Sequence, residues 1–192
     1  MPRSGTEARE RLTRAALELF LERGFDAVTA AEIAARAGVT ERTYFRHFPD
    51  KREVLFDGER QLTEWVTEAL ASVPDDVPLW PAMRRTVDLI VAPLEANRPD
   101  SDRLAAIVAA TPALRERAVS KEARLVAMIT VLLLARGASA DEAALVARTA
   151  WGVLAHATGA WRAAPGTSLQ RHVDRSFTLL IGLVSVSSRT PS

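Results

Sequence analysis

The stretch AAEIAARAGVTERTYFRHF, residues 30–48, has the pattern of two short helices joined by a tight turn. Thr29 precedes it, and Glu32 follows three residues later, the capping-box spacing that begins a helix. Gly38 suits the left-handed conformation that ends a helix, and Thr40 can cap the next one. The pattern therefore predicts a helix-turn-helix arrangement, although an ordinary helical hairpin has the same spacing.

A longer helix is predicted before this stretch. It begins at the Ser4-x-x-Glu7 capping box and ends at Gly24. Its apolar residues recur at helical spacing and form one buried stripe, which contains Leu12, Ala15, Ala16, Leu19 and Phe20. The second helix contributes Ile33, Ala34 and Ala37 to the same core.

The third helix divides into two faces. Tyr44 and Phe48 lie four residues apart and can point inward with Val39. The outward or flanking residues are Thr40, Glu41, Arg42, Thr43, Phe45, Arg46 and His47. Arginine can bind guanine in the major groove, threonine can contact a thymine methyl group or a phosphate, and histidine can bind phosphate. This mixture favours DNA binding over a merely solvated helix.

The rest of the chain also has helical spacing, and no stretch alternates as a strand does. We therefore predict an all-α protein with an N-terminal three-helix helix-turn-helix domain, residues 1–49, and a C-terminal helical ligand-binding and dimerisation domain, residues 50–192. A helix is expected from an Asp50-x-x-Glu53 box to about Ser72. The further predicted helices span residues 79–94, 101–110, 112–136, 140–163 and 168–186, the fourth of them opened by a Ser139-x-x-Glu142 box.

Composition excludes several classes of function. The 192 residues include no cysteine, which excludes thiol catalysis, cysteine-bound zinc and disulfide scaffolds. The three histidines, His47, His156 and His172, are scattered, so no metal site, cofactor site or catalytic set is predicted, and we expect the protein not to be an enzyme. The net charge of +1 does not by itself indicate a nucleic-acid partner. No membrane span or signal segment is apparent, and a cytoplasmic protein without a membrane partner is expected.

The segment FLERGFDAVTAAEIAARAGVTERTYFRHFPDKREVLF, residues 20–56, resembles the N-terminal DNA-binding signature of the TetR family of transcriptional regulators. The resemblance covers roughly residues 8–56 and implies a dimer on palindromic double-stranded operator DNA. Many family members have tyrosine where Phe45 stands and a small residue in place of Arg42; we expect Arg42 to read a base directly. The resemblance and the residue chemistry together give the candidate DNA-binding residues Thr29, Thr40, Glu41, Arg42, Thr43, Phe45, Arg46, His47 and Lys51.

The last two predicted helices are apolar nearly all round. A two-layer monomer cannot cover both faces of such helices, so a symmetric dimer is expected, with a four-helix bundle formed by these helices of each chain. TetR-like proteins dimerise in this way. The candidate dimer-interface residues are Leu145, Gly152, Ala155, Gly159, Val173, Phe177, Leu180, Ile181 and Val184.

Some apolar residues between the helix-turn-helix domain, called the head below, and these helices are expected to line an effector cavity. This expectation concerns the group, because a plain packed core is the more common role for any single one of them. The candidate pocket residues are Trp65, Met83, Val87, Ile90, Arg103, Leu104, Val108, Leu125, Met128, Ile129, Trp151 and His156. The segments ATPALRERA, residues 110–118, and ARGASADEA, residues 135–143, are similar to a TetR subgroup that responds to acyl-CoA thioesters. An apolar or amphipathic effector, such as an acyl-CoA, is therefore expected.

Two functions remain after these exclusions. The first is a homodimeric repressor, released from its operator by a small, mostly apolar effector. The alternative is a dimeric small-molecule-binding or interaction module whose head no longer reads DNA. Salt-sensitive binding to specific DNA distinguishes these two functions, because only a sequence-specific DNA-binding protein shows it.

Overall fold

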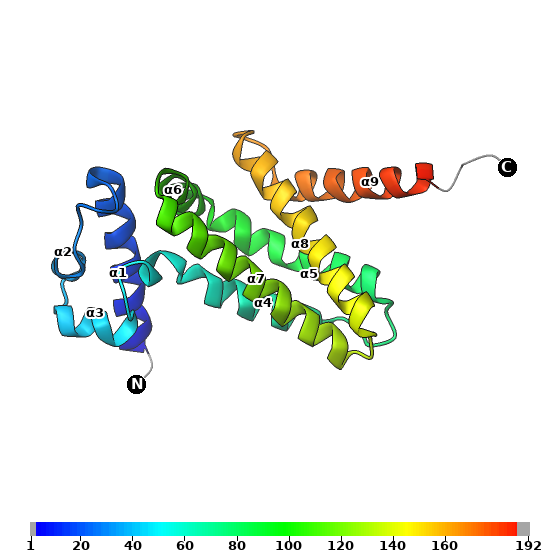
Figure 1. Ribbon diagram of the computed structural model, residues 1–192, viewed down its shortest axis with the longest axis horizontal. Coiled ribbons are helices and arrows are strands. Elements are labelled where there is room, and N and C mark those ends of the chain that lie inside the picture. Colours follow the sequence, from blue (N-terminus) through cyan, green and yellow to red (C-terminus); the bar gives the residue numbers. More distant parts are fainter. Residues whose placement is uncertain (1–2, 188–192) are drawn as a thin grey trace. The chain divides into compact units, whose positions relative to one another are not determined.

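The computed structural model describes residues 3–187, and every regular element among them is a helix (Figure 1). This confirms the all-α class and an N-terminal helix-turn-helix followed by a helical C-terminal part. None of the helices within the described range is long and apolar enough to cross a bilayer. The elements are α1 (Arg3–Arg23), α2 (Ala30–Arg36), α3 (Glu41–His47), the 3₁₀ helix η1 (Glu53–Phe56), α4 (Gly58–Ser72), α5 (Leu79–Ala96), α6 (Arg98–Ala110), α7 (Pro112–Ala135), α8 (Ala140–Arg162) and α9 (Leu169–Ser187).

Capping residues begin three of the predicted helices. Thr29 and Glu32 form the predicted reciprocal box at α2, and Ser139 and Glu142 form another at α8. Thr40 caps α3 by accepting a hydrogen bond from the Thr43 amide. Helix α1, in contrast, begins at Arg3, before the predicted cap, and the Ser4 side chain lies outside the described residues.

The predicted helix from Asp50 to Ser72 is interrupted, and this expectation was wrong at its start. Asp50 does cap the segment, because its carboxylate accepts from the amides of Arg52 at 2.7 Å and Glu53 at 3.1 Å. The chain then forms η1, and the α-helix starts only at Gly58. The Glu53 carboxylate does not complete the box, because it binds Arg117 and Lys121 of α7.

Contacts divide the chain into two compact units. Unit 1 comprises Met1–Leu62 and Arg98–Lys121, and unit 2 comprises Thr63–Asn97 and Glu122–Ser192. The contacts thus group α6 and the start of α7 with the helix-turn-helix, which differs from a simple division at residue 49. The functional boundary at residues 49 and 50 stays a prediction.

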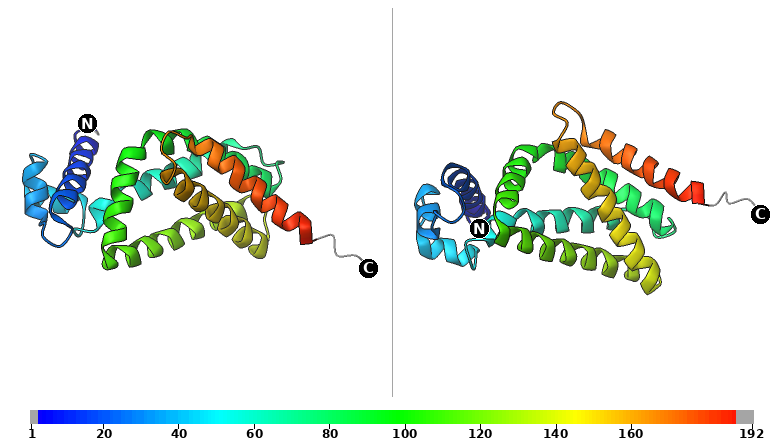
Figure 2. Two further views of the ribbon diagram at one scale, coloured as in Figure 1. Left: turned by 90° about the horizontal axis from the view of Figure 1, so that it is seen from above. Right: turned by 45° about the horizontal axis from the view of Figure 1, so that its top comes forward.

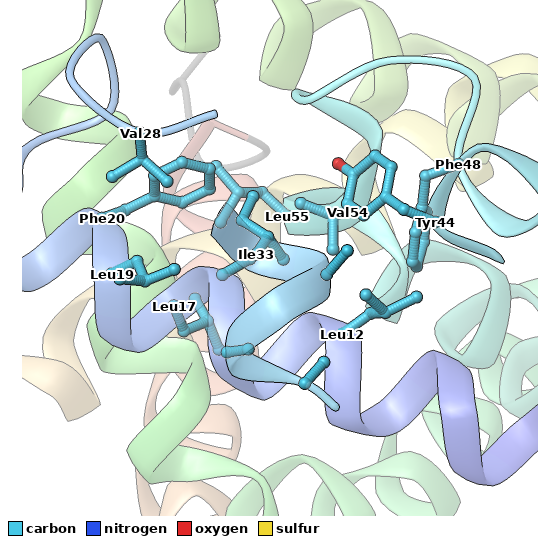
Figure 3. Close-up of a cluster of buried hydrophobic side chains, with 14 of the residues drawn as sticks. Leu12, Leu17, Leu19, Phe20, Val28, Ile33, Tyr44, Phe48, Val54 and Leu55 are labelled. Atoms are coloured by element: carbon cyan, nitrogen blue, oxygen red, sulfur yellow. The ribbon is translucent and has the colours of Figure 1, made fainter. Parts of the chain in front are cut away.

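Unit 1 is built on one apolar cluster, part of which Figure 3 shows. The predicted stripe of α1 is buried, and Ile33, Tyr44 and Phe48 of the two short helices pack onto it. Val54 and Leu55 of η1 close the cluster, joined by Ile107 of α6 and Leu114 of α7. The orientation of α3 is therefore set by its buried side.

Unit 2 is formed mainly by α5, α8 and α9, which pack against one another. Trp80 of α5 lies 5.4 Å from the Phe177 ring of α9, measured between ring centroids, and the Arg84 guanidinium lies 4.3 Å above the Phe177 centroid. Figures 1 and 2 show that α9 meets α8 near the loop between them and that the C-terminal half of α9 runs clear of α8.

Candidate nucleic-acid interface

The buried side of α3 fixes which residues face outward. Tyr44 and Phe48 are 0% and 1% exposed, as the spacing predicts, and their ring centroids lie 5.6 Å apart. The Tyr44 hydroxyl donates to the Asp50 carbonyl at 3.3 Å, and burial raises the pKa of Tyr44. With this side held in the core, α3 cannot rotate without exposing two aromatic rings.

The opposite side of α3 presents the predicted DNA-binding residues. Thr43 and His47 are half-buried, whereas the exposed members are Thr40, Glu41, Arg42, Phe45 and Arg46. Phe45 is 51% exposed, which is high for a phenylalanine. The structure therefore brings the α3 candidates together on one surface.

Two arginines of this surface differ from Arg23 of α1 and Arg36 of α2. Arg23 forms an ion pair with Glu32, and Arg36 pairs with Glu22. Arg42 and Arg46 form no hydrogen bond or ion pair with the residues whose side chains the structure describes, 5–185. Their guanidinium groups are thus available for an anionic or base-edge partner from outside.

The threonine candidates mainly hold helix ends. The Thr29 hydroxyl donates to the Glu32 carboxylate at 2.8 Å and accepts from the Glu32 amide at 3.2 Å. The backbone and side-chain hydrogen bonds from Thr29 lower the pKa of Glu32 to about 2. The Thr40 and Thr43 hydroxyls lie 3.0 Å apart. Each cap therefore satisfies one backbone amide in the first turn of its helix, that of Glu32 in α2 and that of Thr43 in α3.

Lys51 is placed differently from the exposed candidates. Its ammonium donates to the carbonyls of Phe25 at 2.7 Å and Val28 at 2.9 Å, and it lies 4.2 Å above the centroid of the Phe25 ring. Burial lowers the pKa of Lys51. Lys51 thus binds the turn between α1 and α2, and only one of its three N–H groups remains for a phosphate, so that contact stays a prediction.

His47 lies beside a second internal contact. Its Nε2 is buried and has no hydrogen-bond partner among the described residues, while its carbonyl accepts from Arg9 at 3.3 Å. Arg9 also pairs with Asp57 and covers the Phe48 ring. Burial, followed by the charges of Arg46 and Arg9, lowers the pKa of His47, and Asp57 opposes them. Arg9 therefore joins α1 to the residues after α3.

Sequence reasoning missed one charged cluster in unit 1. Arg117 and Lys121 of α7 both bind the Glu53 carboxylate, and Lys121 also binds Glu59 of α4 at 2.5 Å. Burial raises the pKa of Glu53, but these hydrogen bonds and positive charges outweigh it and hold that pKa below its ordinary value. No local signal predicts this cluster, because its partners lie more than 60 residues apart in sequence.

The predicted pocket residues do not form one set. Leu104 and Val108 pack against the core of unit 1, and the exposed Arg103 pairs with Asp100. Trp151 donates to the Glu122 carboxylate, and His156 is exposed. In unit 2, Met83, Val87, Ile90, Leu125 and Ile129 are buried, whereas Trp65 and Met128 are half-buried. A surface depression lined by Arg52, Arg115 and Arg117 contains none of the predicted residues.

The predicted dimer residues also divide. Val173 and Phe177 are 0% and 4% exposed, so they belong to the core of unit 2 and their prediction as interface residues was wrong. Trp80 and Arg84 of α5 cover Phe177. The remaining candidates are half-buried or exposed: Leu180 is half-buried, and Leu145, Gly152, Ala155, Gly159, Ile181 and Val184 are exposed.

Comparison with known proteins identifies the N-terminal segment. Residues 12–57 match the model of bacterial regulatory proteins of the tetR family. A stretch of 66 residues, 34% of this chain, is 41% identical to an uncharacterized HTH-type transcriptional regulator of Mycobacterium tuberculosis and 50% identical to the HTH-type transcriptional regulator TcmR of Streptomyces glaucescens. It spans only 33% and 29% of those proteins.

Solved structures extend the likeness in fold. The Thermus thermophilus repressor FadR, in complex with lauroyl-CoA, aligns with a TM-score of 0.53 at 24% identity over 90% of this chain and 93% of its own. NalD of Pseudomonas aeruginosa, a repressor of a multidrug efflux pump, aligns with a TM-score of 0.57 at 23% identity over 91% of this chain and 96% of its own. Both of these proteins are named as repressors. Residues 12–57 therefore match the tetR family of bacterial regulatory proteins, and the chain has the fold of these two solved structures over most of its length.

Proposed function

We propose that this protein is a homodimeric transcriptional repressor that binds a palindromic operator and is released by a small, mostly apolar effector. The observation that carries the proposal is the outward side of α3, where Arg42 and Arg46 form no ion pair with described residues while Tyr44 and Phe48 hold the other side in the core. A helix presented in this way can enter a major groove. The proposal includes a cytoplasmic location, where a bacterial operator is found.

Exposed apolar side chains support the dimer. Leu145 of α8 is 68% exposed, and Ile181 and Val184 of α9 are 57% and 66% exposed. Gly152 and Gly159 lie on the exposed side of α8, where a helix of a second chain can approach closely. Covering these residues with the same surface of a second copy would give a two-fold symmetric dimer, and a palindromic operator has the same symmetry.

The effector proposal rests on the fold and on two short segments. FadR, which has the same fold, is described in complex with lauroyl-CoA. The resemblance of residues 110–118 and 135–143 to acyl-CoA-responsive regulators points to the same class of ligand. The effector releases DNA only if it binds the DNA-free arrangement of the dimer more tightly than the DNA-bound one.

DNA binding is tested by fluorescence anisotropy of the purified protein on its own upstream DNA, with unrelated DNA as competitor, at two salt concentrations. We expect binding that survives the competitor and weakens steeply with salt. Arg42→Ala should reduce discrimination between the operator and mutated operators. Arg36→Ala, which removes an arginine that is already paired with Glu22, is the matched control and should leave discrimination unchanged. Binding no stronger than to random DNA would favour the interaction module.

Dimerisation is tested by sedimentation equilibrium. Ile181→Glu places a charge in the proposed interface and should yield monomers. Leu89→Glu is the control, because Leu89 on α5 is similarly exposed, at 54%, and lies outside the proposed interface. If both variants remain dimeric, the interface lies elsewhere.

Effector release is tested by adding lauroyl-CoA to the protein–DNA complex, with CoA alone as the control. We expect release by lauroyl-CoA only. Trp65→Ala, at a half-buried candidate pocket position, should weaken release while leaving DNA binding intact. Unchanged release would remove Trp65 from the pocket, and no release by lauroyl-CoA would exclude this acyl-CoA.

A further inference from the structure

Phe45 is an apolar side chain without a core function. Its ring is 51% exposed in the middle of α3, where Tyr44 and Phe48 already fill the core. It meets the Tyr44 ring edge-on, with centroids 5.4 Å apart and planes at 82°. Tyr44 is fully buried, so this contact restricts the orientation of Phe45 from one side and leaves its other side open.

The neighbours of Phe45 are polar groups that suit base edges. Glu41 lies four residues before it and Arg42 three residues before it, so all three share one face of α3. Arg42 is suited to guanine, and the Glu41 carboxylate is suited to the cytosine amino group. The apolar group that base edges present in the major groove is the C5-methyl group of thymine.

We propose that Phe45 determines specificity by packing its ring on the C5-methyl group of a thymine in each operator half-site. The proposal rests on the DNA-binding function proposed above and names the chemical group that this residue recognises. An apolar contact explains why a large exposed ring stands between groups that form hydrogen bonds. It requires no hydroxyl group on the ring.

The test removes only the methyl group. Once the operator is mapped by footprinting, each thymine of a half-site is replaced in turn by deoxyuridine, symmetrically in both half-sites, and affinity is measured by anisotropy. At one position the wild-type protein should lose about fourfold in affinity per half-site, or about fifteenfold for the symmetric pair, the effect expected for burying one methyl group at each site. Phe45→Ala should bind the thymine and deoxyuridine operators equally.

Two further variants complete the design. Phe45→Tyr keeps the ring and should retain the preference for thymine. Leu21→Ala removes another exposed apolar side chain of unit 1, 47% exposed on α1, and should retain it as well. Thermal melting checks that Phe45→Ala is folded, which its exposure favours.

The outcomes separate the two proposals. Absence of operator-specific binding by the wild-type protein would overturn both. Specific binding with equal affinity for all thymine and deoxyuridine operators would overturn the role of Phe45 alone. A preference for thymine that persists in Phe45→Ala would assign the methyl contact to another residue, and an equal loss of affinity for every operator would place the ring against a sugar.

Discussion

Replacing Lys51 with methionine separates the two roles that this residue can have. Methionine keeps an unbranched apolar stem over the Phe25 ring but removes the ammonium that binds the carbonyls of Phe25 and Val28 at 2.7 and 2.9 Å. These contacts hold the turn that leads directly into Thr29, the cap of α2. The structure therefore predicts that Lys51→Met acts mainly through the stability of the head.

The size of the effect follows from the interactions that the ammonium makes. Hydrogen bonds to charged groups contribute about 1.5–3 kcal/mol each, and an exposed cation–π contact contributes about 0.5–1 kcal/mol. Lys51 is half-buried, and the cost of burying its charge, which lowers its pKa, offsets part of this gain. We expect a net loss of about 2 kcal/mol, or a thermal midpoint lower by about 4–8 °C in a chain of this size.

DNA binding supplies the second readout. At a temperature where Lys51→Met is fully folded, the slope of log affinity against log salt should equal that of the wild type. Arg46→Met, which removes an exposed cation of α3, should lower the slope by about 0.9 for each phosphate that the guanidinium no longer neutralises. A lower slope for Lys51→Met without a change in thermal midpoint would refute the reasoning and make Lys51 a phosphate ligand.

Three further predictions concern stability. Thr40→Ala removes the cap of α3 and should cost about 1 kcal/mol in urea unfolding, whereas Thr40→Ser should be neutral. Glu53 has a pKa below its ordinary value, so its stabilisation is present above about pH 4.5 and is lost as the pH falls further; the difference in urea midpoint between wild type and Glu53→Gln should shrink from pH 7 to pH 3, and a constant difference would contradict this. His47 also has a lowered pKa, so the folded state takes up its proton less readily than the unfolded chain. Stability should fall as the pH drops below about 6.5, and His47→Gln should reduce that fall in thermal melts between pH 7 and pH 5.

Local signals predicted the elements that carry the site. The caps at Thr29, Thr40 and Ser139 act within three residues, so the sequence alone identifies the helices that they begin. The inward residues of α3 follow from helical spacing and from the apolar side chains at those positions. The outward surface of α3 was therefore predictable, and its contacts with DNA stay a prediction.

Partners distant in sequence explain what was not predicted. The capping box at Asp50 fails because Glu53 binds residues 64 and 68 positions away. Phe177 shares a helical face with exposed residues, but periodicity does not reveal that Trp80 and Arg84 cover it. Lys51 likewise has acceptors 23 and 26 positions earlier, which its place in a basic pair does not indicate.

The shared carboxylate of Glu53 constrains how this sequence can diverge. Glu53 and Lys121 are only 17% and 11% exposed, so a neutral residue at either position strands a charge that water reaches poorly. Two more charged residues belong to the same network, because Arg117 also binds Glu53 and Glu59 also binds Lys121. Substitutions at these four positions should therefore appear in related proteins as paired changes, with charge removed or reversed on both sides together. Such paired changes would show that the segment after α3 and helix α7 evolve together.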